Sequence, residues 1–371
     1  MKNNNKQKKQ RSRLRWLFAP VAVVLFFALI EGALALMGFR YDPFMKAPKW
    51  WVRFEGQPIY LVHPLRFWQL RPLSNATRPI ESPDTQFVNS LGFRDEEFDK
   101  KKVDGELRVI ALGDSCTFGD GVADWATYSN VLERNLKHDM DRKVTVINAG
   151  VPGYTSYQCL SYLQYDLLAY KPDLVTIYVG LNDNIPADNS VPDSARKPNL
   201  PEVYAHYQSL RKLRFVQGIE YLIGKYLRPV GTQKISTKEG HNTYRVPMDE
   251  YVQNLCAIKK LGDEKGFKVI VMTIPHVFEQ ESERNKMVRQ AAADCGIPMI
   301  DLFAELKKLQ AQGENHYEAD GGHPNTLGHR RIAWLIQRKM HELGMAPEPL
   351  PITVEPSGEP IPVPDAPAKE F

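Results

Sequence analysis

The feature that most constrains the fold is a series of short, continuous apolar runs rich in Val and Ile. Five such runs occur, at Leu107–Leu112, Lys143–Asn148, Asp173–Val179, Phe267–Ile274 and Ile297–Leu302. Continuous runs, unlike alternating ones, are typical of parallel strands covered on both faces. Helical patterns follow them, at about 124–140, 154–170, 248–265, 281–295 and 325–344. The alternation predicts a doubly wound α/β domain.

One connection in this domain is too long for a simple crossover. Some 65 residues separate Asn182 from Met248, whereas loops in compact α/β domains run about 2–6 residues. We therefore expect an insertion at about 185–247, with one or two helices near 202–227. The insertion begins beside the C-terminal end of a strand, where open α/β sheets bind ligands. The insertion is either a lid that covers the ligand site and shapes it for the substrate, or a surface insertion without a function of its own.

The N-terminus is basic and then apolar. Residues 1–15 hold seven Lys or Arg and no acid, and residues 16–39 hold a single charge, Glu31. About 20 apolar residues span a bilayer core, so we expect a single transmembrane anchor at 16–39 behind a basic cytoplasmic tail, 1–15. The alternative is a cleaved signal peptide, because the A-L-A sequence at 33–35 fits a cleavage site. Both predictions place the remaining chain in the periplasm or outside the cell.

Two further segments flank the predicted domain, which spans 107–344. Residues 40–106 are rich in aromatic residues and proline, and we expect an irregular connector packed on the domain or on the membrane surface. Eight prolines among the last 25 residues predict a disordered Pro-rich tail at 345–371. After residue 15 the acidic residues slightly outnumber the basic ones, so no nucleic-acid partner is expected.

The four cysteines, Cys116, Cys159, Cys256 and Cys295, form no C-x-x-C pair, which argues against a zinc ribbon or a thioredoxin-like site. Cys159 and Cys256 lie among apolar neighbours in helical patterns, and small buried thiols are common. We expect four free cysteines. A Cys256–Cys295 bridge, which an exported compartment would permit, is the less favoured alternative.

Small and polar residues follow three of the predicted strands. The first run leads into GDSCTFG, where Ser115 enters a turn at the end of a strand. The second leads into NAGVPGY, where Gly153 lets backbone amides approach a ligand. The third leads into GLND, where the Asn182 amide either donates to a ligand or caps a turn. The carboxyl ends of parallel strands meet at one edge of a sheet, so these residues are expected to converge.

A fourth block, DGGHPN, precedes the last predicted helix and contains Asp320 and His323. The three-residue spacing lets the carboxylate orient the imidazole and fix its tautomer, which leaves the other ring nitrogen as a base. Ser115 then has a base, an orienting acid and convergent donors. This combination of groups is typical of enzymes that catalyse acyl transfer.

The order and content of the four blocks resemble the SGNH hydrolases, also called GDSL esterases or lipases, over roughly 107–344. The resemblance implies a flavodoxin-like three-layer α/β/α sandwich. It also implies a catalytic triad of Ser115, Asp320 and His323, with an oxyanion hole formed by Ser115, Gly153 and Asn182. The connector sequence NSLGFR resembles a segment that precedes the domain in membrane-anchored bacterial members, which suggests a bacterial envelope protein.

The activity implied by this resemblance is that of a serine esterase, which cleaves carboxylic esters through an acyl-enzyme and uses no metal or organic cofactor. The expected partners are an ester substrate, namely a small acyl ester, a lipid or an acetylated glycan, and the membrane through the N-terminal helix. One alternative is an O-acetyltransferase acting on an envelope or exported glycan. A second is a non-catalytic envelope-binding module. The sequence leaves the oligomeric state open.

Overall fold

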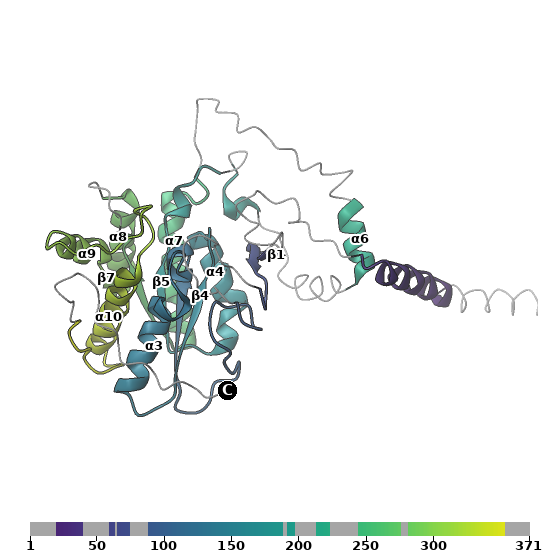
Figure 1. Cartoon of the computed structure of the whole chain (residues 1–371). Coiled ribbons are helices and arrows are strands. Elements are labelled where there is room, and N and C mark those ends of the chain that lie inside the picture. Colours follow the sequence, from purple (N-terminus) through teal and green to yellow (C-terminus); the bar gives the residue numbers. More distant parts are fainter. Residues whose placement is uncertain are drawn as a thin grey trace, which may run out of the picture. The chain divides into compact units, whose positions relative to one another are not determined.

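The structure is a computed structural model, and its described residues fall into two compact units. The smaller unit comprises Met1–Trp50 and Pro198–Ser236, and the larger comprises Trp51–Lys197 and Thr237–Phe371. The larger unit contains the central sheet (Figure 1). The described residues are 20–39, 59–63, 65–74, 88–187, 191–196, 213–222, 244–275 and 281–352.

A five-stranded parallel sheet with the order β4-β3-β5-β6-β7 forms the centre of the larger unit. Its strands are β3 (Leu107–Gly113), β4 (Val144–Gly150), β5 (Leu174–Tyr178), β6 (Lys268–Met272) and β7 (Met299–Ile300). The prediction of an α/β domain with a parallel sheet is confirmed. The chain leaves β3 toward one side to form β4 and then continues on the other side with β5. Ligands of open α/β sheets bind at such a reversal of strand order.

Helices cover both faces of this sheet (Figure 1). Helices α3 and α10 pack against each other on one face, whereas α7 packs against α4 and α8 on the other. The α-helices are α2 (Ser115–Phe118), α3 (Tyr128–Asp139), α4 (Ser156–Tyr165), α7 (Met248–Lys265), α8 (Glu283–Cys295), α9 (Leu302–Gln310) and α10 (Thr326–Glu342). Short 3₁₀ helices lie at Asp124–Ala126, Leu167–Tyr170, Asn182–Asn184 and Asp193–Arg196.

The strands of the sheet centre are buried on both faces, as their continuous apolar runs predict. Every residue of β3 and β4 is buried. Alternate residues of β3, including Val109 and Ala111, join the hydrophobic cluster formed with α3 and α10. Ile110 and Leu112 between them are fully buried as well. This double burial holds the strand ends, and therefore the loops that follow them, in a rigid frame.

Three local features differ from the predictions. The connector contains an antiparallel hairpin of β1 (Tyr60–His63) and β2 (Phe67–Leu70), where an irregular segment was expected. Helix α9 was not predicted, and β7 is shorter than its apolar run. The sequences of β1 and β2, YLVH and FWQL, do not alternate strictly between apolar and polar residues, so the pattern of a half-buried strand is absent.

The prediction of four free cysteines is wrong. Helices α7 and α8 pack against each other, and a disulfide joins Cys256 of α7 to Cys295 at the end of α8, with Cα atoms 5.6 Å apart. Cys116 and Cys159 are free and buried. The sequence neighbourhood of Cys256 is that of a buried thiol, and only the contact between the two helices brings its partner within reach.

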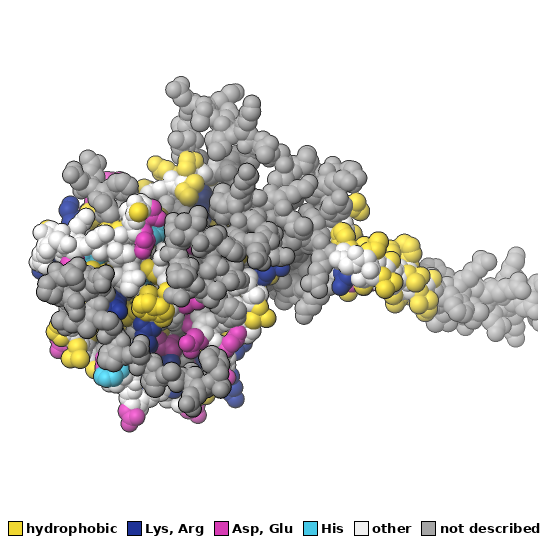
Figure 2. All heavy atoms as spheres, viewed as in Figure 1, with side chains coloured by type: hydrophobic (Ala, Val, Ile, Leu, Met, Phe, Trp, Pro, Cys, Tyr) yellow, Lys and Arg dark blue, Asp and Glu magenta, His cyan; other side chains and the backbone are white. Residues whose placement is uncertain are grey.

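The smaller unit contains a helix at 20–36 and α6 (Arg214–Leu222). The Glu31 carboxylate accepts hydrogen bonds from the backbone N–H groups of Arg214 (3.0 Å) and Phe215 (2.9 Å), at the start of α6. Hydrophobic side chains cover the helix at 20–36 (Figure 2). Among the described residues, no helix has both the length and the apolar character needed to cross a membrane. Residues 1–19, which include the predicted basic tail, lie outside the described residues.

The two remaining predicted segments are described in part. Within the insertion, α6 lies in the interval where helices were expected, and Pro186 pairs with Tyr244 across the ends of the insertion. Within the predicted tail, residues 345–352 are described, and Leu350 accepts a hydrogen bond from Trp334 Nε1 (2.8 Å). Residues 353–371 lie outside the described residues.

Candidate active site

The end of strand β3 places Ser115 at the edge of the sheet. The strand ends at Gly113, Asp114 caps the following helix, and Ser115 is the first residue of α2. A Cβ atom on Gly113 would lie 2.1 Å from Thr117 Oγ1 and 2.2 Å from Tyr178 O, so only glycine allows this tight turn. The turn directs the first residue of α2 toward the carboxyl edge of the sheet, where a ligand has access.

Ser115, His323 and Asp320 form one hydrogen-bonded chain. Ser115 Oγ lies 2.9 Å from His323 Nε2, and His323 Nδ1 lies 2.6 Å from Asp320 Oδ2. The structure thus brings together three residues that two distant sequence blocks contribute. A serine bonded to an imidazole, which is in turn bonded to a carboxylate, can transfer the serine proton to the ring.

The Asp320 carboxylate is held by its own turn. Its Oδ1 atom accepts from the N–H groups of Gly322 (2.9 Å) and His323 (3.0 Å). Burial acts to raise the pKa of Asp320, but these backbone bonds and the bond from the His323 ring outweigh it and lower that pKa to about 2. Asp320 is therefore ionised at neutral pH and available to orient the ring.

Gly153 lies in the loop that follows β4. Its φ of +81° is in the left-handed region that favours glycine. Among the described residues, neither the Gly153 N–H nor the Ser115 N–H has a hydrogen-bond acceptor. Unpaired backbone donors in an accessible loop are suited to an anionic oxygen.

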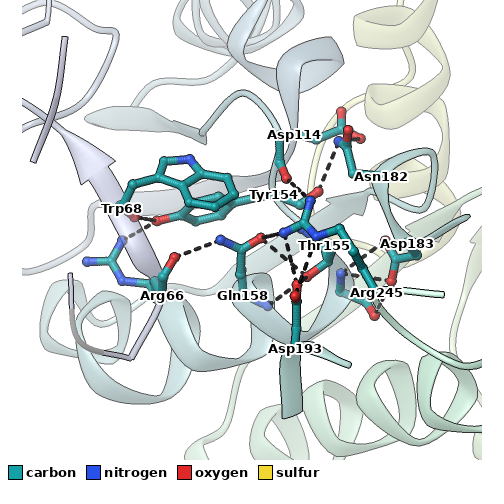
Figure 3. Close-up of polar contacts among 12 residues, drawn as sticks. Arg66, Trp68, Asp114, Tyr154, Thr155, Gln158, Asn182, Asp183, Asp193 and Arg245 are labelled. Atoms are coloured by element: carbon teal, nitrogen blue, oxygen red, sulfur yellow. Dashed lines mark hydrogen bonds and ion pairs between the residues drawn. The ribbon is translucent and has the colours of Figure 1, made fainter. Parts of the chain in front are cut away.

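Asn182 begins a 3₁₀ helix shortly after β5. Its Nδ2 atom donates to Tyr154 O (3.1 Å) and to Asp114 Oδ2 (3.3 Å) (Figure 3). Asn182 therefore lies between the loop of Gly153 and the residue that precedes Ser115. Both amide hydrogens have partners in this structure. A ligand oxygen that binds this amide would have to replace one of these two acceptors.

Asp114 is a site residue to which the sequence analysis gave no role. Its side chain is fully buried and accepts from Cys116 N–H (3.0 Å) as well as from Asn182. Burial raises the pKa of Asp114 to about 7, although the hydrogen bond from Cys116 and the nearby His323 ring oppose the rise. Its position immediately before Ser115 in the GDS sequence is the signal that could have identified it.

The other candidate groups near Ser115 do not form a second reactive centre. Cys116 is buried and its Sγ lies 3.7 Å from Gly322 O, and burial raises the pKa of its thiol. A thiol of this kind is a poor nucleophile at neutral pH. The described residues contain no group of His, Cys, Asp or Glu side chains that could hold a metal ion.

A polar network lies behind the loop of Gly153 (Figure 3). Arg245, near the end of the insertion, donates to Gly153 O (2.8 Å) and Gln158 Oε1 (2.7 Å), and it pairs with Asp193 Oδ2 (2.9 Å). Trp68 of the connector donates through Nε1 to Pro152 O (3.1 Å). None of these side chains belongs to a sequence block that indicated a function.

Comparison with known proteins indicates one family. The sequence pattern of the GDSL-like lipase/acylhydrolase family matches residues 111–331, more than half of the chain. This range includes all four sequence blocks. No curated protein matches the chain.

The chain also matches solved structures, at low sequence identity. A lipase/acylhydrolase from Enterococcus faecalis is 21% identical, with a TM-score of 0.42 over 66% of this chain and 100% of that one. An acetylxylan esterase from Geobacillus stearothermophilus is 18% identical, with a TM-score of 0.40 over 63% of this chain and 94% of that one.

Proposed function

The chain belongs to the GDSL-like lipase/acylhydrolase family and is an ester-hydrolysing serine hydrolase, and from this premise we propose that Ser115 is its nucleophile. The observation that carries the proposal is the hydrogen-bonded chain from Ser115 Oγ through His323 to Asp320, with distances of 2.9 and 2.6 Å. His323 serves as the general base. Asp320 orients the His323 ring and stabilises the imidazolium.

The proposed reaction has two halves. Ser115 Oγ attacks the ester carbonyl while its proton passes to His323 Nε2. The tetrahedral intermediate collapses, the alcohol leaves with the proton from His323, and an acyl-enzyme remains. Water then attacks the acyl carbon and gives a proton to His323. The second tetrahedral intermediate collapses as His323 returns this proton to Ser115 Oγ, which releases the acid and restores the enzyme.

The negative oxygen of the tetrahedral intermediate needs donors that are already in place. We assign this role to the N–H groups of Ser115 and Gly153 and to the Asn182 amide. The first two assignments are supported because these N–H groups have no acceptor in the part of the chain that the structure describes. For Asn182, the 3.3 Å bond to Asp114 is exchanged for a bond to the oxyanion, while the 3.1 Å bond to Tyr154 O is kept.

A fluorophosphonate probe tests the nucleophile. It should phosphonylate Ser115 alone, as located by mass spectrometry of the digested protein, and Ser115→Ala should abolish both labelling and ester hydrolysis. Ser90→Ala is the matched control, because Ser90 is an exposed connector serine bonded to Glu97, and it should react normally. Labelling that persists in Ser115→Ala would assign the chemistry to another residue.

The acyl group and the alcohol can be identified with a panel of esters. The panel should include p-nitrophenyl esters of increasing chain length and acetylated xylooligosaccharides, since a similar structure is an acetylxylan esterase. Adding an unacetylated oligosaccharide to a reaction with p-nitrophenyl acetate separates hydrolysis from transfer. We expect free acetate as the product. Acetylated oligosaccharide as the main product would establish an O-acetyltransferase instead.

We also propose that the chain is a single-pass membrane protein with its N-terminus in the cytoplasm and its catalytic unit in the periplasm or outside the cell. Seven basic residues before residue 16 and the exposed apolar side chains of the helix at 20–36 support this topology. The Cys256–Cys295 disulfide supports an oxidising compartment.

Cell fractionation and N-terminal sequencing of the mature protein test this topology. An uncleaved chain in the membrane fraction is expected. A mature chain that starts near Leu36 and is soluble would identify a cleaved signal peptide.

A further inference from the structure

The loop at 152–154 is held at three consecutive carbonyl groups. Pro152 O accepts from Trp68 Nε1 (3.1 Å), Gly153 O accepts from Arg245 Nη1 (2.8 Å), and Tyr154 O accepts from Asn182 Nδ2 (3.1 Å). The three donors come from the connector, the end of the insertion and the segment after β5. Pro152 and Tyr154 are buried, so side-chain donors take the place of water at these carbonyl groups.

The bond from Trp68 controls the direction of the Gly153 N–H. The C=O of Pro152 and the N–H of Gly153 belong to one peptide group, which is planar and trans. In a trans peptide the two groups point in opposite directions. By holding Pro152 O, Trp68 therefore makes the Gly153 N–H point away from the indole, and this N–H is the donor that lacks an acceptor among the described residues.

The indole of Trp68 also shapes the backbone of Gly153. A Cβ atom on Gly153 would lie 3.1 Å from Trp68 Cζ2, so the ring packs directly against the glycine. Trp68 is itself buried, with 7% of its surface exposed. Its carbonyl accepts from Tyr154 Oη (2.6 Å), which ties the hairpin to the same loop from the other side (Figure 3).

The backbone next to Trp68 is strained. Phe67 has a φ of +67°, which an aromatic residue rarely adopts. Such strain persists only where the surrounding structure imposes it, and it is concentrated at functional sites. Phe67 is the first residue of β2 and directly precedes Trp68.

Arg245 holds the peptide group on the other side of Gly153. Its guanidinium lies 5.5 Å from the Trp68 ring and is fixed by Asp193 and Gln158 (Figure 3). Both peptide groups that flank Gly153 thus have a side-chain donor at their oxygen atoms. Rotation of the Gly153 N–H would break at least one of these bonds.

We propose that Trp68, in the connector that precedes the catalytic domain, is a positioning residue that orients the Gly153 N–H toward the oxyanion. The proposal rests on the proposed function, because it needs a tetrahedral oxyanion at this N–H. It gives the connector a part in catalysis, since the indole of β2 completes the geometry of a loop that follows β4.

Trp68→Phe tests the proposal, because phenylalanine keeps an aromatic ring in the site but lacks the indole N–H. Removing an oxyanion donor lowers turnover by about 100- to 1,000-fold. Loss of a residue that only orients such a donor should have a smaller effect, and we expect kcat to fall about tenfold with KM unchanged. A loss of kcat alone marks an interaction made in the transition state.

Trp334→Phe is the matched control. Trp334 Nε1 also donates to a backbone carbonyl, that of Leu350 (2.8 Å), but it lies on α10 within the C-terminal region. The substitution removes an equivalent indole–carbonyl bond and should leave kcat and KM unchanged. Equal losses of kcat in the two variants would mean that Trp68 acts only through general stability, and the proposal would be overturned.

A replacement with the same shape as Trp68 separates the loss of the indole N–H from a change in packing. Trp68 can be replaced by 3-benzothienylalanine, in which sulfur takes the place of the N–H and the ring keeps its size. Inhibition by phenylboronic acid, which forms a tetrahedral adduct with a nucleophilic serine, should weaken in step with the fall in kcat. Unchanged kcat and unchanged inhibition in this variant would overturn the role of Trp68 even if Trp68→Phe did not fold.

The wild-type protein separates this proposal from the proposed function. Suppose that the wild-type protein hydrolyses esters and is labelled at Ser115, and that the Trp68 variants are fully active. This outcome would overturn only the role of Trp68. A wild-type protein that is folded but neither hydrolyses esters nor reacts with fluorophosphonate would overturn the proposed function, and the role of Trp68 with it.

Discussion

The two sides of the candidate site are built in different ways. One side, which we call the relay side, consists of Asp320 and His323. They are three residues apart, and one partly exposed turn holds them through its own backbone N–H groups. On the other side, that of the proposed oxyanion donors, side chains from other segments hold the loop of Gly153, and two of them, Trp68 and Arg245, are more than 80 residues away in the sequence. The comparison suggests that the relay tolerates changes elsewhere in the chain, whereas the oxyanion loop depends on the tertiary structure.

The largest effect should come from the relay side. Asp320→Asn should lower kcat by about 10⁴-fold, because an amide no longer favours the required tautomer of His323. The melting temperature at neutral pH should fall only modestly, because solvent screens the interactions of a side chain that is about half exposed (48%). Ester kinetics and thermal melting of the purified protein check both expectations.

Glu318→Gln, on the same loop, is the control for Asp320→Asn and should retain full turnover. A loss of less than tenfold in Asp320→Asn would mean that the turn alone orients the ring. The relay would then depend on backbone geometry and not on the carboxylate charge.

A smaller effect is expected on the oxyanion side. Asn182→Ala should lower kcat by about 100- to 1,000-fold through loss of an oxyanion donor. It also removes the bond to Tyr154 O (3.1 Å), and a hydrogen bond of this kind stabilises the fold by about 1 kcal/mol. Kinetics and urea unfolding, measured on one preparation, separate the two contributions.

Asn184→Ala provides the comparison for Asn182→Ala. Asn184 lies on the same 3₁₀ helix, and its side chain accepts from Arg284 Nε (2.6 Å). Its replacement should reduce stability to a similar extent while kcat stays near the wild-type value. If both variants lost turnover equally, Asn182 would act by stabilising the helix and not as a donor.

The smallest expected effect is a difference in pH dependence between the two sides. Burial raises the pKa of Asp183, which accepts from Ser156 behind the oxyanion loop, to about 6. The folded state then binds the proton more tightly than the unfolded state. The contribution of Asp183 to the free energy of unfolding is therefore fully present below a pH of about 4, and it is lost as the pH rises through 6.

Asp320 should behave in the opposite way. Its lowered pKa, about 2, gives a stabilisation that is complete above pH of about 4 and is lost as the pH falls toward 2. Urea unfolding from pH 2 to 7 should therefore show that Asp183→Asn flattens the profile between about pH 4 and 6, and that Asp320→Asn flattens it below about pH 4. Parallel profiles for the two variants would show that the two carboxyl groups have similar surroundings.

Much of the arrangement of the candidate site, at the carboxyl edge of the sheet, was predictable from local patterns. Continuous apolar runs indicate buried parallel strands, and the carboxyl ends of parallel strands must meet, so the expected convergence of Ser115 with its companion blocks needed no knowledge of packing. The hydrogen-bonded chain to His323 and Asp320 agrees with that expectation in its geometry. The catalytic roles of these residues stay predictions until the variants are measured.

The hairpin β1–β2 was not predictable in the same way. Its strands have four residues each, and nothing in the sequence marks the positive φ of Phe67, the residue before Trp68. The disulfide was misjudged for a related reason. Cys256 has the neighbours of a buried free thiol, and the partner that changes its chemistry comes from another helix.

Local sequence patterns were enough to predict the α/β class, the order of the strands along the chain and the turn that pairs Asp320 with His323. Each of these depends on interactions between residues close in sequence or on a repeated pattern. The side chains that hold the loop of Gly153 could be identified only from the folded chain. The donors Trp68 and Arg245 lie 84 and 92 residues from the carbonyls they bind. Bonds over such separations form only when the whole fold closes, because no local preference brings their partners together.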